Sequence, residues 1–305
     1  MLRTTTRWSF RIAILAAVLG ARVLAAQDEE NTLLNDTLVQ AAPIEIEVTR
    51  NVVYGNAGGE DLKLDLARPK GLTHPVPGVL WIHGGAWRGG NKEEFSRQIE
   101  RSAQAGFVAV SIDYRLVPKF LFPAQVEDAK CAVRWLRANA ERLQVDPKRI
   151  AAVGSSAGAH LSMMLGTMDS ADGLEGDGGS AEMPSKVQVV VSYAGPTNLE
   201  GPLSIVAQKL VADFLGGKLG ESIAAARPGS PINYVDSHDA PMLLIQGTKD
   251  PLVPHAQAYQ MIEALTKAGV PGRVEILIGA GHGWPKENAR VERATLAFLA
   301  QYLKK

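Results

Sequence analysis

Eight short runs of apolar and β-branched residues alternate with segments of helical length, and this order limits the possible folds more than any other feature of the chain. The alternation is typical of βαβ units, in which a helix connects neighbouring parallel strands. The predicted strands are 44–48, 62–66, 78–82, 107–112, 150–153, 187–193, 242–246 and 274–278. The first two runs alternate polar and apolar residues, whereas the later ones are almost uniformly apolar, as strands covered on both faces should be. We therefore predict an α/β fold with an eight-stranded, mostly parallel sheet, helices on both faces and an antiparallel pair at one edge.

Five segments between these runs repeat apolar residues at helical spacing, and a sixth predicts a cap. The predicted helices are 93–105, 124–140, 156–168, 255–268 and 287–303. Residues 203–219 form an amphipathic insertion between the sixth and seventh strands, which would fit a small cap over a pocket. Residues 170–184 are rich in Gly, Asp and Ser and predict a loop, and because their acidic residues lack the EF-hand spacing we assign no metal site.

The sequence Gly-Ser-Ser-Ala-Gly at residues 154–158 connects a predicted strand directly to a predicted helix. In this G-x-S-x-G pattern the central Ser156 occupies a sharp turn, and its neighbours two residues away must be small to avoid a collision. The N-terminus of the following helix favours a developing negative charge. Ser155 is an adjacent hydroxyl, but it lies outside the central position of the pattern. We therefore predict Ser156 as a nucleophile.

A serine hydroxyl needs a base in hydrogen-bond contact and an acid that orients the base. His282 lies in a glycine-rich loop directly after the last predicted strand, and Asp250 follows the strand at 242–246. Both positions fall at the carboxyl edge of the sheet, where α/β proteins build their sites. None of the other five histidines has a comparable placement. Asp113 also follows a strand, but it precedes Ser156 in the chain, and we interpret it as a structural ion-pair partner of the nearby Arg115.

The sequence His-Gly-Gly-Ala-Trp at residues 83–87 follows the strand at 78–82 and predicts an oxyanion loop. Its glycines allow backbone amides to turn toward a carbonyl oxygen, and the donors would be the N–H groups of Gly85 and Ala86 with that of Ala157. His83 is interpreted as a residue that holds the loop. Three aromatic residues are candidates for substrate binding, with packing as the alternative role of each: Trp87, Tyr193 and Trp284.

Taken together, these motifs and their order resemble the hormone-sensitive-lipase-like branch of the α/β-hydrolases, especially its small carboxylesterases of the acetyl-esterase and feruloyl-esterase type. The resemblance covers residues 45–303 and includes SIDYRL at 111–116 and SPINYV at 230–235. It implies a serine carboxylesterase with Ser156, Asp250 and His282 as its triad, which hydrolyses short-chain carboxylic esters through an acyl-enzyme and without a cofactor. Acetyl or feruloyl esters of polysaccharides are the expected substrates. Many relatives carry a third glycine in the oxyanion loop where this chain has Ala86, a change that keeps the amide.

Two other functions remain open from the sequence. The same triad can cleave amide or peptide bonds, although the related oligopeptidases carry a large propeller domain for which this chain has no room. A non-catalytic binding protein on the hydrolase scaffold is the second alternative, and the presence of all three triad residues argues against it.

The N-terminal residues predict export of the protein. Three arginines precede a short apolar run at 12–19 and small residues up to Ala26, which is the pattern of a secretory signal peptide. We assign 1–26 to the signal peptide, 27–42 to a flexible leader and 43–305 to a catalytic domain, with cleavage after Gly20 as an alternative. Because the apolar run is too short to span a bilayer, we expect a secreted or periplasmic protein rather than a membrane-tethered one.

The composition limits the partners of the chain. It has 32 basic and 32 acidic residues, so its formal net charge of zero gives no reason to expect nucleic acid or an anionic membrane as a partner. Cys131 is the single cysteine, which excludes an intramolecular disulfide, and we expect a buried, inert thiol. No feature of the sequence indicates an oligomeric state.

Overall fold

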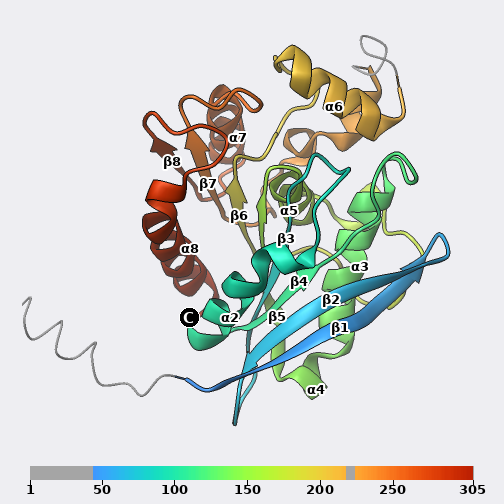
Figure 1. The fold of residues 1–305 in the computed structure, drawn as a ribbon, viewed down its shortest axis with the longest axis vertical. Helices are drawn as coiled ribbons and strands as arrows, with labels where there is room; N and C mark the ends of the chain where they lie inside the picture. The colour runs from blue at the N-terminus through green and yellow to red at the C-terminus, as the bar shows by residue number, and fades with distance from the viewer. Residues whose placement is uncertain (1–43, 218–223, 305) are drawn as a thin grey trace, which may run out of the picture. The chain divides into compact units, whose positions relative to one another are not determined.

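An eight-stranded sheet organises the part of the chain that the computed structural model describes, residues 44–217 and 224–304 (Figure 1). The strands are β1 (Ile46–Ala57), β2 (Glu60–Pro69), β3 (Val76–Ile82), β4 (Val108–Ile112), β5 (Val145–Ser155), β6 (Val189–Tyr193), β7 (Met242–Gly247) and β8 (Gly272–Leu277). Their order is β1-β2-β4-β3-β5-β6-β7-β8. The pairs β1–β2 and β2–β4 are antiparallel and all other pairs are parallel, which confirms the predicted α/β fold and its antiparallel edge.

Helices cover both faces of this sheet. They are α2 (Ser96–Gln104), α3 (Ala124–Ala138), α4 (Ala140–Leu143), α5 (Ala157–Thr167), α6 (Ile205–Leu215), α7 (Ala256–Lys267) and α8 (Asn288–Leu303). Short 3-10 turns are η1 (Lys92–Phe95), η2 (Ser170–Asp172), η3 (Ala224–Gly229), η4 (Pro231–Tyr234) and η5 (Pro285–Glu287). The predicted helix 124–140 is divided at Asn139, which lies between the end of α3 at Ala138 and the start of α4 at Ala140, and the predicted helix 93–105 starts as the 3-10 turn η1.

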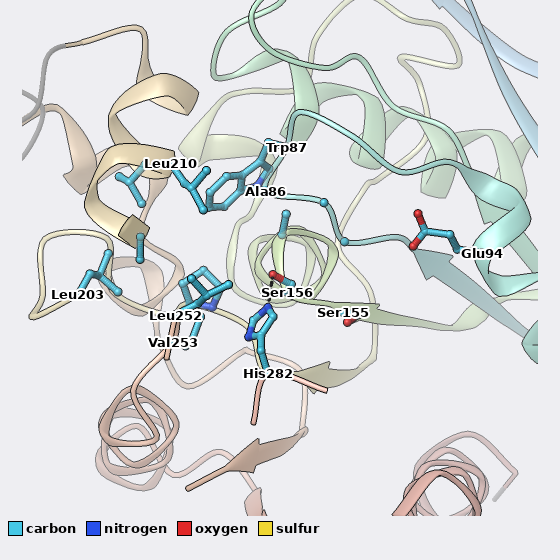
Figure 2. A pocket seen from close by; sticks show the side chains of 16 residues that line it. Ala86, Trp87, Glu94, Ser155, Ser156, Leu203, Leu210, Leu252, Val253 and His282 are labelled. Atoms are coloured by element: carbon cyan, nitrogen blue, oxygen red, sulfur yellow. Dashed lines mark hydrogen bonds between the residues drawn. The ribbon is translucent and has the colours of Figure 1, made fainter. Parts of the chain in front are cut away.

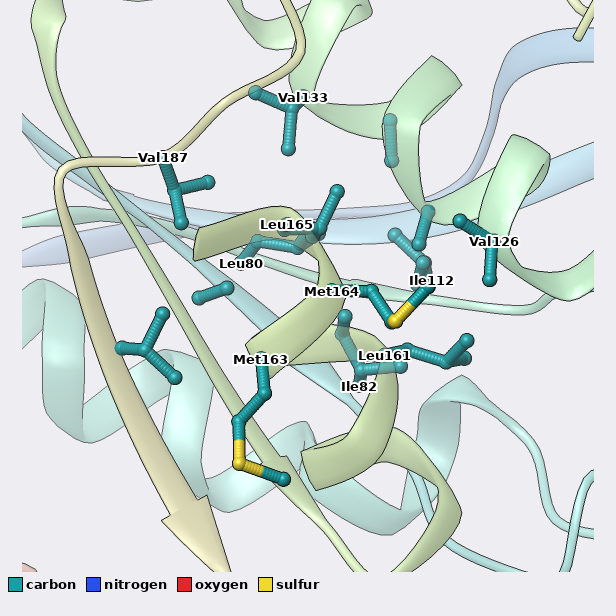
Figure 3. Close-up of a cluster of buried hydrophobic side chains, with 14 of the residues drawn as sticks. Leu80, Ile82, Ile112, Val126, Val133, Leu161, Met163, Met164, Leu165 and Val187 are labelled. Carbon is teal, nitrogen blue, oxygen red and sulfur yellow. The ribbon is translucent and has the colours of Figure 1, made fainter. Parts of the chain in front are cut away.

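Strand β3 shows why the central runs are uniformly apolar. Successive side chains of a strand point to opposite faces, so Leu80 and Ile82 join one buried cluster with α3, α5 and α7, while Val79 and Trp81 join another with α2 and α8. Figure 3 shows the first cluster, in which Leu161 and Met164 of α5 lie beside β3 and α3. Because both faces of such a strand are covered, none of its side chains faces water, and apolar residues are favoured at every position.

The predicted loop at 170–184 is irregular apart from η2, and its acidic residues have structural partners. The Glu175 carboxylate forms ion pairs with Lys130 Nζ at 2.9 Å and with Arg134 Nη1 at 2.8 Å, and both of these cations are buried on α3. Buried charges require such pairing. Within residues 44–217 and 224–304 no group of three or more His, Cys, Asp or Glu side chains is arranged to hold a metal ion.

Cys131 is buried on α3, and its burial raises the pKa of the thiol to about 11, as expected for an inert cysteine. None of the helices in the described residues is long and apolar enough to cross a membrane. The predicted signal peptide at 1–26 and leader at 27–42 lie outside the described residues.

Candidate active site

Ser156 lies at the sharp turn between β5 and α5, in a backbone conformation that non-glycine residues seldom adopt. Its φ is +52° and its ψ is −115°, which stores strain at this residue. The turn requires glycine on both sides of it. A Cβ on Gly158 would lie 2.0 Å from the Ile82 carbonyl oxygen, and one on Gly154 would lie 2.3 Å from the Gly158 carbonyl carbon. The Ser156 amide donates to the Tyr193 carbonyl at 2.7 Å, which ties the turn to β6.

Three side chains from separate loops meet beside this turn. Ser156 Oγ lies 2.9 Å from His282 Nε2, and His282 Nδ1 lies 2.8 Å from Asp250 Oδ2 (Figure 2). Because the carboxylate can only accept, the proton of a neutral imidazole is on Nδ1, and Nε2 can accept the proton of the serine hydroxyl. The loops after β5, β7 and β8 supply these residues, so the carboxyl edge of the sheet brings the three predicted residues together.

Asp250 is held by more than the imidazole. Its Oδ1 accepts the amides of Leu252 at 2.8 Å and Val253 at 3.0 Å, and its Oδ2 accepts Gln246 Nε2 at 2.8 Å. Burial by itself raises the pKa of this carboxyl, but the hydrogen bonds from His282, Val253 and Leu252 outweigh burial and leave the pKa below its ordinary value. Asp250 is therefore a charged, fixed acceptor that can orient His282.

The backbone of the loop at 83–87 has a positive φ at three consecutive residues. Gly85, Ala86 and Trp87 have φ values of +96°, +53° and +58°. The amides of Arg88 and Gly89 donate to the Gly85 carbonyl at 3.0 and 3.1 Å and close the turn. The amides of Gly85 and Ala86 donate to no other residue among those described, so both are available to an oxygen bound in front of Ser156.

His83 holds this loop from behind, as expected from its position. The ring is buried, its Nδ1–H donates to the Gly84 carbonyl at 2.8 Å, and it stacks on Tyr114 at a centroid distance of 4.2 Å. The Tyr114 hydroxyl in turn donates to the carbonyls of His83 and Gly84, each at 3.1 Å. Burial lowers the pKa of His83, so the ring stays neutral and its role is structural.

A cavity of about 340 Å³, which we call the acyl cavity, opens in front of Ser156. One wall is apolar and comes from α6, from Leu203 just before it and from the loop after β7, as Figure 2 shows for Leu203, Leu210, Leu252 and Val253. The insertion at 203–219 thus forms a wall of the cavity through α6, although residues 218 and 219 lie outside the described residues.

Trp87, a candidate for substrate binding, lines the acyl cavity and also packs against neighbouring aromatic rings. Its ring stacks on Phe214 of α6 at 4.2 Å and meets His160 edge-on at 5.2 Å. His160 Nε2 donates to the Gly229 carbonyl at 2.6 Å, so the nucleophile helix is tied to η3 as well. Phe214 and His160 were not among the predicted site residues, because amphipathic spacing shows that a side chain is buried without showing its partner.

The other two aromatic candidates do not line the acyl cavity. Tyr193 and Trp284 meet edge-on at 6.2 Å, and the Tyr193 hydroxyl lies 2.5 Å from Thr295 Oγ1 of α8. Both line a second cavity, of about 630 Å³, rather than the acyl cavity.

The predicted ion pair between Asp113 and Arg115 is wrong. Asp113 accepts the Lys92 amide at 2.8 Å and lies 3.9 Å from Lys92 Nζ. Arg115 instead binds Asp128 and Glu127, because its side chain extends toward α3. Asp113 therefore ties β4 to η1, a structural role served by a different cation.

The chain is similar to a known protein family and to known esterases. The BD-FAE family matches residues 64–265. Similar curated proteins of Mycobacterium tuberculosis are the esterase LipQ, 31% identical over 227 residues (72% of this chain and 53% of LipQ), and the esterase LipC, 32% identical over 249 residues (77% of this chain and 59% of LipC). The chain thus spans somewhat more than half the length of these relatives.

Two solved structures resemble this fold over most of both chains. A truncated form of a carbohydrate esterase from gut microbiota has a TM-score of 0.76 and 26% identity, over 86% of this chain and 98% of that one. Esterase 2 of Thermogutta terrifontis phosphonylated by sarin has a TM-score of 0.74 and 25% identity, over 88% of this chain and 99% of that one.

Proposed function

The chain belongs to the BD-FAE family of α/β-hydrolases, and from this membership we propose that it is a serine carboxylesterase that hydrolyses short-chain carboxylic esters through an acyl-enzyme. The observation that carries the proposal is the continuous contact from Ser156 Oγ through His282 to Asp250, with distances of 2.9 and 2.8 Å. A serine without such a base would be a poor nucleophile at neutral pH.

In the proposed mechanism, Ser156 Oγ attacks the ester carbonyl while His282 Nε2 takes the hydroxyl proton. Asp250 keeps the imidazole oriented and stabilises the imidazolium that forms. The amides of Gly85, Ala86 and Ala157 hold the oxyanion, and each such donor contributes about 3 kcal/mol of transition-state stabilisation. His282 then protonates the leaving alcohol, and a water molecule activated by the same ring releases the acid.

The acyl cavity supports a short or slender acyl group. A volume of about 340 Å³ bounded by Leu203, Leu210 and Val211 fits an acetyl or feruloyl group better than a long lipid chain. We include polysaccharides that carry such esters among the substrates, since one structural neighbour is a carbohydrate esterase and the N-terminal sequence predicts export. The proposed place of action is therefore outside the cytoplasm.

The test compares two adjacent serines. Ser156→Ala should lower kcat for p-nitrophenyl acetate by about 10⁴- to 10⁶-fold and abolish labelling by a fluorophosphonate, with an unchanged Tm. Ser155→Ala is the matched control and should still be labelled, because the hydrogen bond to His282 comes from the Ser156 hydroxyl and not from that of Ser155. Retained labelling in Ser156→Ala would overturn the proposal.

The same experiment distinguishes the esterase from the two alternative functions, a non-catalytic binding protein and an amidase. Absence of labelling in the unaltered protein would favour a non-catalytic binding protein. Labelling accompanied by faster cleavage of the matching p-nitroanilide than of the p-nitrophenyl ester would favour an amidase. The intact hydrogen bonds of the three residues favour the esterase over the binding protein.

A further inference from the structure

A glutamine interrupts one of the buried strands that lead to the site. Strand β7 has the sequence Met-Leu-Leu-Ile-Gln-Gly, and all of its residues are buried, with Gln246 only 2% exposed. A side-chain amide that leaves water costs free energy unless other hydrogen bonds replace those it made to water. The Gln246 side chain therefore needs partners inside the protein, and the identity of these partners indicates its role.

Both partners of the Gln246 amide are acceptors in the loop that carries Asp250. Its Nε2 donates to Asp250 Oδ2 at 2.8 Å and to the Val253 carbonyl at 2.9 Å. An amide nitrogen has two hydrogens, and neither a carboxylate nor a carbonyl can donate, so these bonds use both hydrogens. Val253 returns a bond, because its own amide donates to Asp250 Oδ1 at 3.0 Å. The strand, the carboxylate and the loop are thus joined in one closed ring of hydrogen bonds.

The four hydrogen bonds of the Asp250 carboxylate divide equally between its two oxygens. Oδ1 accepts the backbone amides of Leu252 and Val253, whereas Oδ2 accepts His282 Nδ1 and Gln246 Nε2, each at 2.8 Å. A carboxylate offers about four lone-pair sites, so these donors occupy all of them. Within residues 44–217 and 224–304, Gln246 is the one donor besides His282 to the oxygen that faces the base.

This arrangement gives Gln246 two ways to act on the base. Because the loop anchors Oδ1, a bond at Oδ2 fixes the rotation of the carboxylate about its Cβ–Cγ bond and so the direction in which the imidazole is held. A donor at Oδ2 also takes up part of the negative charge of that oxygen, so less of the charge stabilises an imidazolium. Both effects reach the reaction only through Asp250 and His282.

We propose that Gln246 is a positioning residue for the reaction: it holds Asp250 Oδ2 in line with His282 Nδ1 and limits how strongly the carboxylate favours the protonated imidazole. This inference rests on the proposed esterase function. Since His282 acts as base and acid in both acylation and deacylation, a misplaced ring slows both steps. Loss of the Gln246 amide should therefore lower kcat and kcat/KM by a similar factor and change KM little.

The first experiment removes the amide at similar side-chain volume in the full-length protein. Gln246→Met should lower kcat for p-nitrophenyl acetate about 10- to 100-fold per active site titrated with a fluorophosphonate, with KM within about twofold. The fall of kcat/KM on acidification should also move to higher pH by about 0.5–1 unit, because the unshared charge on Asp250 Oδ2 stabilises the imidazolium. The variant leaves unchanged the other charged groups near this pair, which are Lys249, Glu94, Arg97, Arg101, Lys286 and Glu292.

The matched control is a glutamine at the other end of the sheet. Gln188 directly precedes β6, and its Oε1 accepts the Ile150 amide at 3.0 Å, so it also bonds beside a central strand. Because it lies at the amino ends of the strands, Gln188→Met should leave kcat per active site and the pH profile unchanged, whatever its effect on Tm.

A second variant keeps the shape of the side chain. In Gln246→Glu two carboxyl groups face each other, and such a pair shares one proton. The introduced carboxyl group can donate to Asp250 Oδ2 while it holds that proton, and it repels Asp250 once the proton is lost. The kcat of Gln246→Glu relative to the unaltered protein should therefore rise as pH falls.

Each result decides the proposal. A Gln246→Met variant with a lowered Tm but an unchanged kcat per active site and an unchanged pH profile would overturn it and leave Gln246 with a packing role. If that variant does not fold, Gln246→Glu decides, and a kcat ratio that is independent of pH would count against the proposal. A failure of the esterase function gives a different result, because the unaltered protein would then neither be labelled by the fluorophosphonate nor hydrolyse the ester.

Discussion

The carboxyl edge of the sheet and the α6 wall form the same cavity, yet they are held in place very differently. Ser156, Asp250 and His282 follow strands β5, β7 and β8, and β7 and residues 150–154 of β5 are buried. Helix α6 presents Ile205 and Val206 to solvent, with 76% and 59% exposure, and contacts the core through Ala207, Val211 and Phe214. The proposed catalytic residues are thus held by strands of the central sheet, whereas the shape of the acyl cavity depends on the partly exposed helix α6.

The largest effect is expected at the base. His282→Gln should lower kcat for p-nitrophenyl acetate by about 10⁴- to 10⁶-fold, because the amide cannot take the serine proton. Steady-state assays at neutral pH measure this, with Tm as the control for folding. Normal burst and steady-state rates in the variant would remove His282 from the mechanism and leave the carboxyl edge without its proposed role.

Asp250→Asn should lower kcat by about 10⁴-fold, because an amide favours the wrong tautomer of His282. Its pH dependence provides a second readout. Since the folded-state pKa of Asp250 is below its ordinary value of 3.8, the carboxylate stabilises the fold above that value, and this stability is lost as pH falls through the folded pKa.

Urea unfolding at a series of pH values from about 5 downward would measure this loss. The free energy of unfolding should fall more steeply for the unaltered protein than for Asp250→Asn. Parallel curves for the two proteins would contradict the assignment of a stabilising, charged carboxylate at this position.

A smaller effect is expected where α6 touches the oxyanion loop. Phe214→Ala removes the ring that stacks on Trp87 at 4.2 Å, and Trp87 directly follows Ala86, whose amide is a proposed oxyanion donor. We expect a loss of about 3–5 kcal/mol in stability and, through misplacement of the amides, a fall of about 10²-fold in kcat/KM.

Phe107→Ala is the matched control for Phe214→Ala, since Phe107 is equally buried but lies just before β4, at the opposite end of the strands. It should lower Tm by a comparable amount and leave kcat/KM unchanged. Equal losses of activity in both variants would show that α6 acts through global stability alone.

The smallest effect is expected on the outer face of α6. Ile205→Ser should change the free energy of unfolding by less than about 0.5 kcal/mol, because its side chain is 76% exposed and does not line the acyl cavity. Thermal unfolding together with p-nitrophenyl ester kinetics checks this. A marked fall in the free energy of unfolding or in the ester hydrolysis rate would mean that another molecule covers this face of α6 in solution.

The fold was predictable because its signals are local. A strand buried on both faces must be apolar at every position, so β3 and β7 stood out as runs, and the glycines at 154 and 158 followed from the narrow turn around Ser156. The partners of charged groups were not predictable. Asp113 and Arg115 are two residues apart and still bind different partners, Lys92 of η1 and Asp128 of α3, which the tertiary packing of these elements brings to them.

Sequence alone therefore determined the order of the strands along the chain, the turn that holds Ser156, and the choice of Asp250 and His282 at strand ends. These features depend on backbone geometry and on the alternation of side chains, which a few neighbouring residues specify. Only the tertiary structure decided that Trp87 stacks on Phe214, and that His282 lines both the acyl cavity and the second cavity. Those contacts join segments more than a hundred residues apart, and their geometry is set by packing rather than by any local pattern.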